Sequence, residues 1–437
     1  MFLPNHVLYC IEKLESAGYP TYAVGGCVRD ACLGLQPHDY DLCTAATPEI
    51  TASLFREHTL VRAGEKHGTI GVVVNGEVLE ITTFRTEGDY TDSRHPQWVS
   101  FVPNVELDLA RRDFTVNAMA YSPTRGFADP FGGREDLKNR ILRAVGDPYL
   151  RFTEDALRIL RGVRFAVRYQ LTVDETTLQA MKNLAHRMEH LAKERIFDEL
   201  CKLLPLLTSQ DLCRFAPILS AAIEELAPMV GFQQHTPHHA YDVFTHTAHV
   251  VAGTDHTLPL RWAALLHDVG KVPTFTLDET GRGHFLGHAK VSAQMANEIL
   301  LRLKAPNQLR EDVVFLIEKH MTPLVADKKL LRRRLSQYGQ RRLEMELQLQ
   351  KADFNAKGVT GDTADFSAID AILQEILAED ACLSLKDLAV NGRDLMALGY
   401  SGPAIGQALQ KLLDLVLDDQ VENTKDALLH ALTQQTF

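Results

Sequence analysis

Apolar and β-branched residues occur in short runs over the first ~145 residues. Four of these runs have the length and composition of strands. They are Tyr22–Val24, Thr69–Val74, Val78–Phe84 and Trp98–Val102. Asn75-Gly76 separates the second run from the third and predicts a tight hairpin, because these residue types favour two-residue hairpin turns. Stretches with helical spacing lie between the other runs, so we expect a mixed α/β unit.

Strand signals almost vanish from about Tyr149 onward, and helical periodicity with few glycines continues to the end. A histidine-rich segment, roughly Gln233 to Asp353, stands apart from the helical material on each side. The pattern therefore predicts an α/β head followed by a long all-α remainder. We expect four parts: a head at 1–145, a helical neck at 146–230, the histidine-rich module at 231–357 and a helical, acidic tail at 358–437.

The composition is that of a soluble globular protein, with 45% hydrophobic and 24% charged residues in 437. No apolar run approaches the roughly 20 residues that a membrane span requires. The N-terminus also lacks a basic segment leading into an apolar one, so a cytoplasmic location is expected. The seven cysteines form no Cys-x-x-Cys pair and are expected to be reduced thiols.

The net charge of −11 argues against indiscriminate binding to nucleic acid, because counterion release rewards a basic surface. Two local runs are nevertheless basic. Residues 328–342 contain seven Lys or Arg and no acid, and residues 134–168 contain nine basic residues against five acidic ones. Each run is either a phosphate-facing patch or an ordinary solvated helix face.

The most informative stretch is His38-Asp-Tyr-Asp-Leu42, which follows Val24-Gly-Gly-Cys-Val-Arg-Asp30. If a strand runs from Asp39 to Leu42, Asp39 and Asp41 project from the same face and can clamp a divalent metal. The glycines let backbone N–H groups approach an anion, and Arg29 adds a bidentate positive charge suited to phosphate. Metal and triphosphate together indicate phosphoryl or nucleotidyl transfer.

A third carboxylate, Glu80, lies on the strand predicted at 78–84 and can complete a two-metal site. The alternative is that Glu80 pairs with Arg85 or Arg62. Further on, Asp113 and Asn117 lie among apolar residues after the pair Arg111-Arg112. Burying them requires polar partners, which indicates a networked site.

The segment Arg151-Phe-Thr-Glu-Asp-Ala-Leu-Arg158 is predicted to open a helix with Thr153 as its N-cap. Asp155 and Arg158 are three residues apart and would share a face, either as a functional pair or as an ordinary ion pair.

Together these motifs resemble the class II tRNA nucleotidyltransferases, the CCA-adding enzymes and their bacterial poly(A) polymerase relatives. The resemblance is carried by four separated motifs, Gly25-Gly26-x-x-Arg29-Asp30, Asp39-x-Asp41, Arg111-Arg-Asp-Phe-Thr-x-Asn-Ala118 and Glu154-Asp155-x-x-Arg158. It implies a polymerase-β-like nucleotidyltransferase head, with tRNA, CTP and ATP as partners.

The resemblance also implies roles for individual residues. Asp39 and Asp41 would bind Mg²⁺. Glu80 is expected as a further catalytic carboxylate from its place on the predicted neighbouring strand, and not from the resemblance. Asp155 and Arg158 would read the incoming base, because a carboxylate accepts from the exocyclic amine of cytosine or adenine, whereas uracil and guanine present a carbonyl there. The residues expected to contact the nucleotide's phosphates are Gly26, Arg29, Arg112, Arg161 and Arg164. Helical geometry turns Arg164 well away from Asp155, so Arg164 can instead serve the helix or RNA.

The polar segment 87–96 resembles the mobile loop with which the family switches from C to A addition. Its completeness favours addition of the full CCA sequence.

Within the histidine-rich module, His267-Asp268 places an imidazole beside a carboxylate at an apolar helix end, a combination that suits Zn, Mn, Fe or Ni. The module resembles the HD phosphohydrolase superfamily, whose metal-ligand roles would fall on His246, His267, Asp268 and Asp353. His288 and His320 resemble the additional ligands of dinuclear members. His249 is the chief rival of His246, and Lys271 could bind phosphate. Fused HD modules in this family are associated with phosphatase, 2′-nucleotidase and 2′,3′-cyclic phosphodiesterase activities.

The tail resembles the part of the longer bacterial members that holds the folded tRNA, although its acidic composition also suits a packing domain without RNA contact. The leading hypothesis is template-independent CCA addition to tRNA. The alternatives are an A-adding enzyme, a poly(A) polymerase, or an HD phosphohydrolase with a nucleotide-binding head. No membrane contact and no protein partner are expected.

Overall fold

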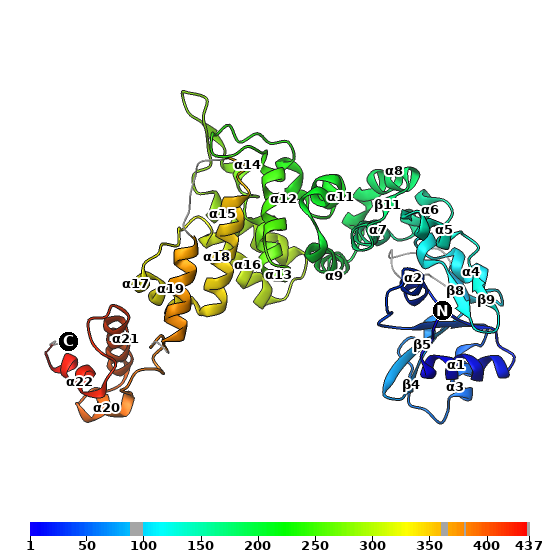
Figure 1. The fold of residues 1–437 in the computed structure, drawn as a ribbon, viewed down its shortest axis with the longest axis horizontal. Coiled ribbons are helices and arrows are strands. Elements are labelled where there is room, and N and C mark those ends of the chain that lie inside the picture. Colours follow the sequence, from blue (N-terminus) through cyan, green and yellow to red (C-terminus); the bar gives the residue numbers. More distant parts are fainter. Residues whose placement is uncertain (88–98, 360–365, 380–381, 435–437) are drawn as a thin grey trace. The chain divides into compact units, whose positions relative to one another are not determined.

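The computed structural model describes residues 1–87, 99–359, 366–379 and 382–434. The chain forms two compact units (Figure 1). The first comprises Met1–Ala227 with Arg302–Lys304, and the second Pro228–Leu301 with Ala305–Phe437. The first unit contains the expected head and neck, and the second begins close to the expected start of the histidine-rich module.

The head is built on a seven-stranded sheet with the order β3-β4-β5-β2-β1-β8-β9. Its strands are β1 (Thr21–Val24), β2 (Asp41–Thr44), β3 (Leu60–Val61), β4 (Thr69–Val74), β5 (Glu77–Thr83), β8 (Ala120–Ser122) and β9 (Gly126–Ala128). β2 runs parallel to β5 and antiparallel to β1, so the sheet is mixed. The predicted α/β head is therefore confirmed.

The predicted hairpin is also confirmed. β4 and β5 pair antiparallel up to Val74 and Glu77, and the two connecting residues, Asn75 and Gly76, have φ of 54° and 85°. Positive φ at both positions is the requirement of a type I′ turn, whose twist matches that of the flanking strands. The run predicted at 98–102 corresponds to β7 (Val99–Phe101), which pairs with β6 (Arg85–Glu87).

Helices cover both faces of this sheet. α1 (Asn5–Ser16) packs on β1, and α3 (Pro48–Leu54) packs on β4 and β5. Val24 and Cys43 belong to a separate buried cluster with Leu109 of α4 (Val105–Ala110). Because successive strand residues point to opposite faces, these side chains project away from those of Ala23 and Leu42.

The rest of the first unit is helical. Its helices are α6 (Pro148–Glu154), α7 (Leu157–Arg168), α8 (Glu175–Leu184), α9 (Lys193–Leu203), α10 (Ser209–Arg214) and α11 (Ala216–Ala222). α7 is strongly amphipathic and packs on α9. Gly162 lets α7 approach its neighbours, because a Cβ there would lie 2.9 Å from the ring of Phe114.

In the second unit, four mutually packed helices form the histidine-rich module: α12 (Val243–Gly253), α13 (Leu258–Leu266), α16 (Asn307–Lys319) and α18 (Gln340–Asn355). α15 (His288–Arg302) belongs to the same module. α17 (Lys328–Tyr338) packs on α18 and on α19 (Phe366–Ala378). The prediction of a helical remainder is confirmed for most of its length. The prediction of an all-α remainder is wrong at three two-residue strands of the described chain, β11 (Thr172–Val173), β12 (Thr276–Leu277) and β13 (Gly283–His284).

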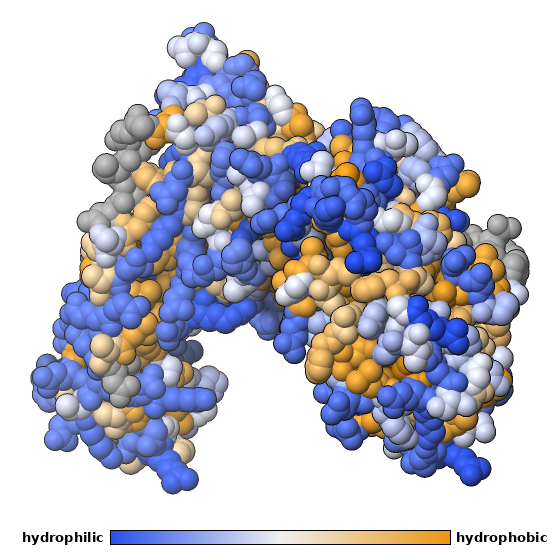
Figure 2. All heavy atoms as spheres, turned by 45° about the vertical axis from the view of Figure 1, so that its right-hand side comes forward, coloured by the Kyte–Doolittle hydropathy of each residue, from blue (hydrophilic) through white to orange (hydrophobic). Residues whose placement is uncertain are grey.

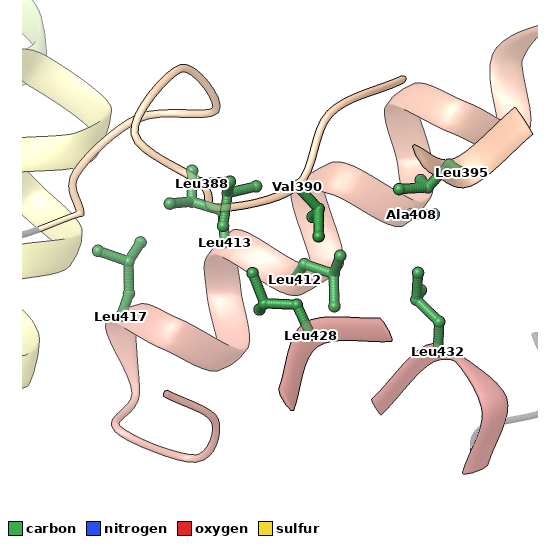
Figure 3. Close-up of a cluster of buried hydrophobic side chains, with 9 residues drawn as sticks. All are labelled: Leu388, Val390, Leu395, Ala408, Leu412, Leu413, Leu417, Leu428 and Leu432. Atoms are coloured by element: carbon green, nitrogen blue, oxygen red, sulfur yellow. The ribbon is translucent and has the colours of Figure 1, made fainter. Parts of the chain in front are cut away.

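The tail has a small core of its own, drawn in Figure 3. Leucines from α21 (Pro403–Leu417) and α22 (Lys425–Gln434) meet Leu395 of α20 (Gly392–Ala397) and the preceding Val390. Gly399 and Gly402 have φ of 92° and 57°, values that a residue without a Cβ adopts at no steric cost, and they form the turn between α20 and α21.

Hydrophilic residues are spread over the face shown in Figure 2, with hydrophobic residues gathered in patches between them. Among the described residues, no helix combines the length and apolar character needed to cross a bilayer.

Candidate functional site

The carboxylates of the head meet at the junction of two parallel strands. Asp41 is the register partner of Glu80 across β2 and β5, so both side chains project from the same face of the sheet. Both residues line one pocket of about 630 Å³ together with Asp39. β2 begins at Asp41, so Asp39 lies in the loop before the strand. The prediction of a strand from Asp39 to Leu42 is therefore wrong about where the strand begins. The loop, and not strand alternation, brings the two aspartates to one pocket.

Electrostatics in this pocket favour a cation. Burial raises the pKa of Asp41, the carboxylates of Glu80 and Asp39 raise it further, and Arg112 opposes them. Arg62 is bound to Glu65 instead, at 3.0 Å, and within the described part of the chain Glu80 has no ion-pair partner. Three clustered carboxylates with an excess of negative charge are a donor set that suits a hard divalent ion such as Mg²⁺.

The glycine pair connects β1 to α2 (Gly26–Cys32). Gly25 has φ of 75°, and a Cβ there would lie 2.9 Å from Nη1 of Arg112, so glycine permits the close approach of this arginine. The Arg29 side chain is buried and does not extend freely into solvent. It donates to Asn117 Oδ1 and to the hydroxyl of Tyr169, both at 2.5 Å, and also to Asp30. The structure thus places Arg29 within a protein network beside the glycine loop.

Asp113 is the centre of this network. Its Oδ1 accepts from Asn117 Nδ2 at 3.0 Å, and its Oδ2 accepts from Nε of Arg161 at 2.8 Å. Burial by itself would raise the pKa of Asp113, but the Arg161 guanidinium and the Asn117 amide lower it to about 2. The expectation that Asp113 and Asn117 need polar partners is confirmed.

The prediction that a helix begins at Thr153 is wrong. Thr153 lies inside α6, whose N-cap is Asp147, accepting from the Tyr149 amide at 2.8 Å. The helical path then breaks at Asp155, which has φ −144° and ψ 102°. The Asp155 carboxylate accepts from the amide of Leu157 at 3.0 Å and opens α7, which is the usual way in which aspartate competes with helix hydrogen bonding.

This break separates the two predicted base-reading residues. Asp155 is bound to Arg195 of α9 at 2.8 Å. Arg158 is buried and donates to Glu154 at 2.7 Å and to the carbonyl of Arg111 at 3.0 Å. The two side chains are thus bound by different partners, and their i,i+3 spacing does not make them an ion pair.

The remaining arginines predicted to contact phosphate are also bound within the protein. Arg112 pairs with buried Asp108 at 3.3 Å, and Arg164 pairs with buried Glu199 at 2.5 Å. Arg164 therefore serves the packing of α7 on α9, the alternative that helical geometry had indicated. Residues 88–98, most of the expected C-to-A switching loop, lie outside the described residues.

Sequence reasoning missed three residues of this region: Tyr169, Arg195 and Glu199. All three lie on the neck, 35 to 140 residues from their partners in sequence. Only the arginine-rich pattern of α7 hinted that complementary groups would be needed.

In the histidine-rich module, side chains from five segments converge. His246 comes from α12, His267 and Asp268 follow α13, and Asp353 comes from α18. His246 Nε2 lies 2.9 Å from Asp353 Oδ1, and His267 Nε2 lies 3.2 Å from Asp268 Oδ2. His288 at the start of α15 and His320 after α16 place their Nε2 atoms 3.3 Å apart.

A shared pattern of hydrogen bonds orients these four imidazoles. Each Nδ1 lies within 3.2 Å of a backbone carbonyl, contributed by Ala356, Ala264, Phe285 and Ile317 in turn. Because a carbonyl only accepts, each Nδ1 carries the hydrogen, and in the neutral ring the Nε2 lone pair points inward. This arrangement is typical of histidines that bind metal.

Two orphaned buried atoms test whether the site fits a metal. His267 Nε2 and Asp268 Oδ1 are buried and have no hydrogen-bond partner among the described residues. The possible ligand atoms here form two groups, and within each group they lie within 4.8 Å of one another. One group is His246, His267 and Asp268, and the other is Asp268, His288 and His320. Asp268 therefore belongs to both groups. The donor set therefore fits one or two transition-metal ions with Asp268 between them. His249 is instead packed against Tyr241, with the ring centroids 4.7 Å apart.

Asp268, His288, His320 and Asp353 line a pocket of about 870 Å³. Lys271 lies in its wall with Nζ 2.8 Å from Asp268 Oδ2. His239, which the sequence reasoning did not single out, lines the same pocket and packs edge-on against His246 at 4.7 Å. Burial lowers the pKa of His239 to about 3, so its ring is neutral near pH 7. Its buried Nδ1 has no hydrogen-bond partner among the described residues.

The basic run at 328–342 forms internal ion pairs. Lys328 binds Glu375 and Glu379, and Arg333 binds Asp418 of the tail. Arg332, Arg334, Arg341 and Arg342 likewise bind carboxylates. Most of this charge is therefore neutralised by carboxylates of the protein itself, which corresponds neither to a phosphate-facing patch nor to a simple solvated helix face.

Models of known protein families match three parts of the chain. The poly(A) polymerase head domain matches residues 21–143. The RNA- and SrmB-binding site of polymerase A matches residues 170–206, and tRNA nucleotidyltransferase domain 2 matches residues 278–432.

Similar whole chains are also known. The chain is 33% identical to the CCA-adding enzyme of Streptococcus suis over 427 residues, 97% of this chain and 95% of that one. It is 35% identical to that of Streptococcus sanguinis over 437 residues, with coverage of 97% and 95%. The crystal structure of the Bacillus stearothermophilus CCA-adding enzyme in complex with CTP covers 99% of this chain and 98% of its own, with 27% identity and a TM-score of 0.76.

Proposed function

The chain belongs to the family of CCA-adding enzymes, and from this membership we propose that it adds C, C and A to the 3′ end of tRNA, using CTP and ATP without a nucleic-acid template. The 3′ hydroxyl of the RNA attacks the α-phosphate of the nucleotide, a new phosphodiester bond forms, and pyrophosphate leaves. The observation that carries the proposal is the in-register placement of Asp41 beside Glu80, with Asp39 in the same pocket.

The head carboxylates have the role of holding metal and substrate together. Asp39 and Asp41 would hold Mg²⁺, with Glu80 beside them. The bound ion would supply Lewis-acid stabilisation of the triphosphate and lower the pKa of the attacking hydroxyl. Gly26 and the glycine loop present backbone N–H groups to the phosphates, and Arg112 brings a positive charge to the same loop.

The residues that select the base lie at the break between α6 and α7. The Asp155 carboxylate, steadied by Arg195, accepts from the amine of cytosine or adenine, and Arg158 is fixed beside it by Glu154. Uracil and guanine present an acceptor to the same carboxylate, and an unpaired buried acceptor costs roughly 1–3 kcal/mol. Selectivity for C and A follows from that difference.

The test is incorporation of labelled nucleotide. The purified protein is given Mg²⁺, a tRNA transcript ending at the discriminator base, and CTP or ATP singly and together. Two C and then one A are expected. A alone on the bare end would indicate the A-adding alternative, and long A tracts would indicate a poly(A) polymerase.

We propose a second activity for the histidine-rich module, metal-dependent hydrolysis of a phosphate ester. The orphaned atoms of His267 and Asp268 favour it, together with the pocket onto which the site opens. His246, His267, Asp268 and Asp353 would hold one transition-metal ion, such as Ni, Mn, Fe or Zn, and His288 and His320 would complete a second position with Asp268. A bound ion would supply an activated water nucleophile. Lys271 would hold the phosphate.

This second proposal is tested by hydrolysis of 2′,3′-cyclic AMP and of nucleoside 2′-monophosphates after removal of metal and reconstitution with single metals. Activity that appears only with a transition metal supports it. Absence of hydrolysis with every metal, in a protein that binds those metals stoichiometrically, would contradict it.

A further inference from the structure

The basic run at 134–168 differs from the run at 328–342 in how its charges are satisfied. Most of its members bind carboxylates, as Arg143 does with Asp174 at 2.7 Å and Arg161 with Asp113. Three do not. Within the described residues, Arg134, Arg140 and Arg168 have no carboxylate partner, and all three are exposed.

These three arginines lie on one side of the first unit. Arg134 and Arg140 line the same pocket of about 870 Å³. Arg140 donates to the carbonyl of Tyr169 at 3.2 Å, and the Arg168 guanidinium lies 5.5 Å from the ring of Tyr169. Arg140 and Arg168 thus both lie next to the buried Tyr169, and we call Arg134, Arg140 and Arg168 together the arginine patch.

The acids near this patch are fewer than its basic residues. Arg134, Lys138 and Arg140 line the pocket against Asp129 and Glu135, of which Asp129 accepts from the backbone amides of Gly133 and Arg134 and Glu135 pairs with Lys138. With Arg168, the surface carries a small excess of positive charge on a chain whose net charge is −11. A stacked guanidinium keeps its outer N–H groups available, and Arg134 is held in this way, 4.5 Å from the ring centre of Phe127.

The backbone of Arg140 adds an independent observation. Arg140 has φ of 57°, a left-handed conformation in which arginine is uncommon and glycine or asparagine is ordinary. Its amide and carbonyl are bonded to Leu137 and Thr172, so the neighbouring chain fixes this conformation. The fixed backbone holds the base of the Arg140 side chain at the pocket that it lines together with Arg134.

The location of the patch indicates its ligand. Ala31, Cys32 and Leu33, at the end of α2, line the same pocket as Arg134 and Arg140. The other end of α2 carries Gly26 and Arg29. The patch is therefore about the length of α2, roughly 10 Å for seven residues at about 1.5 Å per residue, from the glycine loop. We propose that the arginine patch binds backbone phosphates of the substrate RNA next to the 3′ end that is being extended. This inference rests on the proposed nucleotidyl transfer to RNA.

The test is the salt dependence of RNA binding. The probe is a tRNA transcript lacking its 3′ CCA, titrated by fluorescence anisotropy between 50 and 200 mM salt. The slope of log K against log salt is negative, and each lost phosphate contact lowers its magnitude. The reduction is about 0.9 for a duplex and about 0.7 for a single strand, the values that hold for DNA. R134Q/R168Q, which keeps Arg140 and its bond to Tyr169, should lower the magnitude of the slope by about 1.4 to 1.8. Adding R140Q should lower it further.

R143Q is the matched control, because Arg143 is exposed to a similar degree in the same run but is already neutralised by Asp136 and Asp174. Its slope should equal that of the wild type. Equal slopes for wild type and R134Q/R168Q, in variants with unchanged melting temperature, would overturn the proposal. An increase in the KM for CTP with unchanged RNA affinity would also overturn it, because the patch would then serve the triphosphate. Failure of the wild type to extend this transcript would instead contradict the proposed function, since binding is measured without nucleotide.

Discussion

The hydroxyl of Tyr169 accepts a hydrogen bond of 2.5 Å from Nη2 of Arg29, across 140 residues of sequence. The guanidinium also stacks on the Tyr169 ring, with its carbon 4.3 Å from the ring centre. Arg29 also donates to Asn117, and Asn117 donates to Asp113. Asp113 in turn accepts from Arg161. The end of α7 is in this way connected to the start of α2, and so to the glycine loop.

Tyr169→Phe should therefore lower kcat/KM for both CTP and ATP by about tenfold, because a hydrogen bond to a charged group contributes roughly 1.5–3 kcal/mol. The loss should appear mainly in KM, since Arg29 would be less well positioned beside the triphosphate. Tyr121→Phe is the control, because within the described residues the Tyr121 hydroxyl forms no hydrogen bond and its ring packs on Phe127. Equal kinetics for the two variants would contradict a positioning role.

Asp41→Ala should abolish nucleotide incorporation and leave metal-dependent hydrolysis of 2′,3′-cyclic AMP unchanged, whereas His267→Ala should do the reverse. The physical reason is that the two sites share no residue and belong to separate compact units. Both reactions are measured on each purified variant. Loss of both activities in either variant would show that the sites depend on one another.

Asp155→Asn should relax base selection. The amide NH₂ of asparagine can donate to the O4 of uracil, where the aspartate presents only acceptors. Incorporation of UTP relative to CTP should rise by at least about tenfold, the factor that corresponds to roughly 1.4 kcal/mol. The ratio is measured with each nucleotide singly on the same transcript. An unchanged ratio with a lower overall rate would assign Asp155 a structural role through Arg195.

The double variant His288→Ala/His320→Ala should bind one transition-metal ion fewer than the wild type. These two histidines complete only the second of the two groups that meet at Asp268. Metal content is measured by elemental analysis after reconstitution and desalting. The same metal content in both proteins would restrict the site to His246, His267, Asp268 and Asp353.

Stability should depend on the protonation of Glu346. Burial raises the pKa of this carboxyl to about 6, although Arg334 opposes the shift. The folded state therefore binds a proton more tightly than the unfolded state, whose glutamate pKa is about 4.3. The corresponding stability is fully present below pH ~4 and is lost as the pH rises through about 6, by roughly 2 kcal/mol. Glu346→Gln should remove this dependence, as measured by urea unfolding of the second unit at pH 4.5 and 7.5.

The sequence by itself determined the local elements and the chemistry that they carry. The runs at 69–74 and 78–84 and the turn Asn75-Gly76 are local patterns, and each corresponds to the observed hairpin. The prediction that Asp113 and Asn117 need polar partners also followed from local context. Spacing alone predicted one helix through Asp155, because helical periodicity continues on both sides of a break that a single side chain creates.

Only the tertiary structure decided which groups meet. Arg29 and Tyr169 are 140 residues apart, and His246 and Asp353 are 107 apart. Their pairing depends on how helices and strands pack, which no short pattern encodes. The same holds for the two basic runs, which look alike in sequence. Folding brings Asp418, Glu375 and Glu379 to one of them, whereas Arg134, Arg140 and Arg168 of the other keep their charge without a carboxylate partner in the described chain.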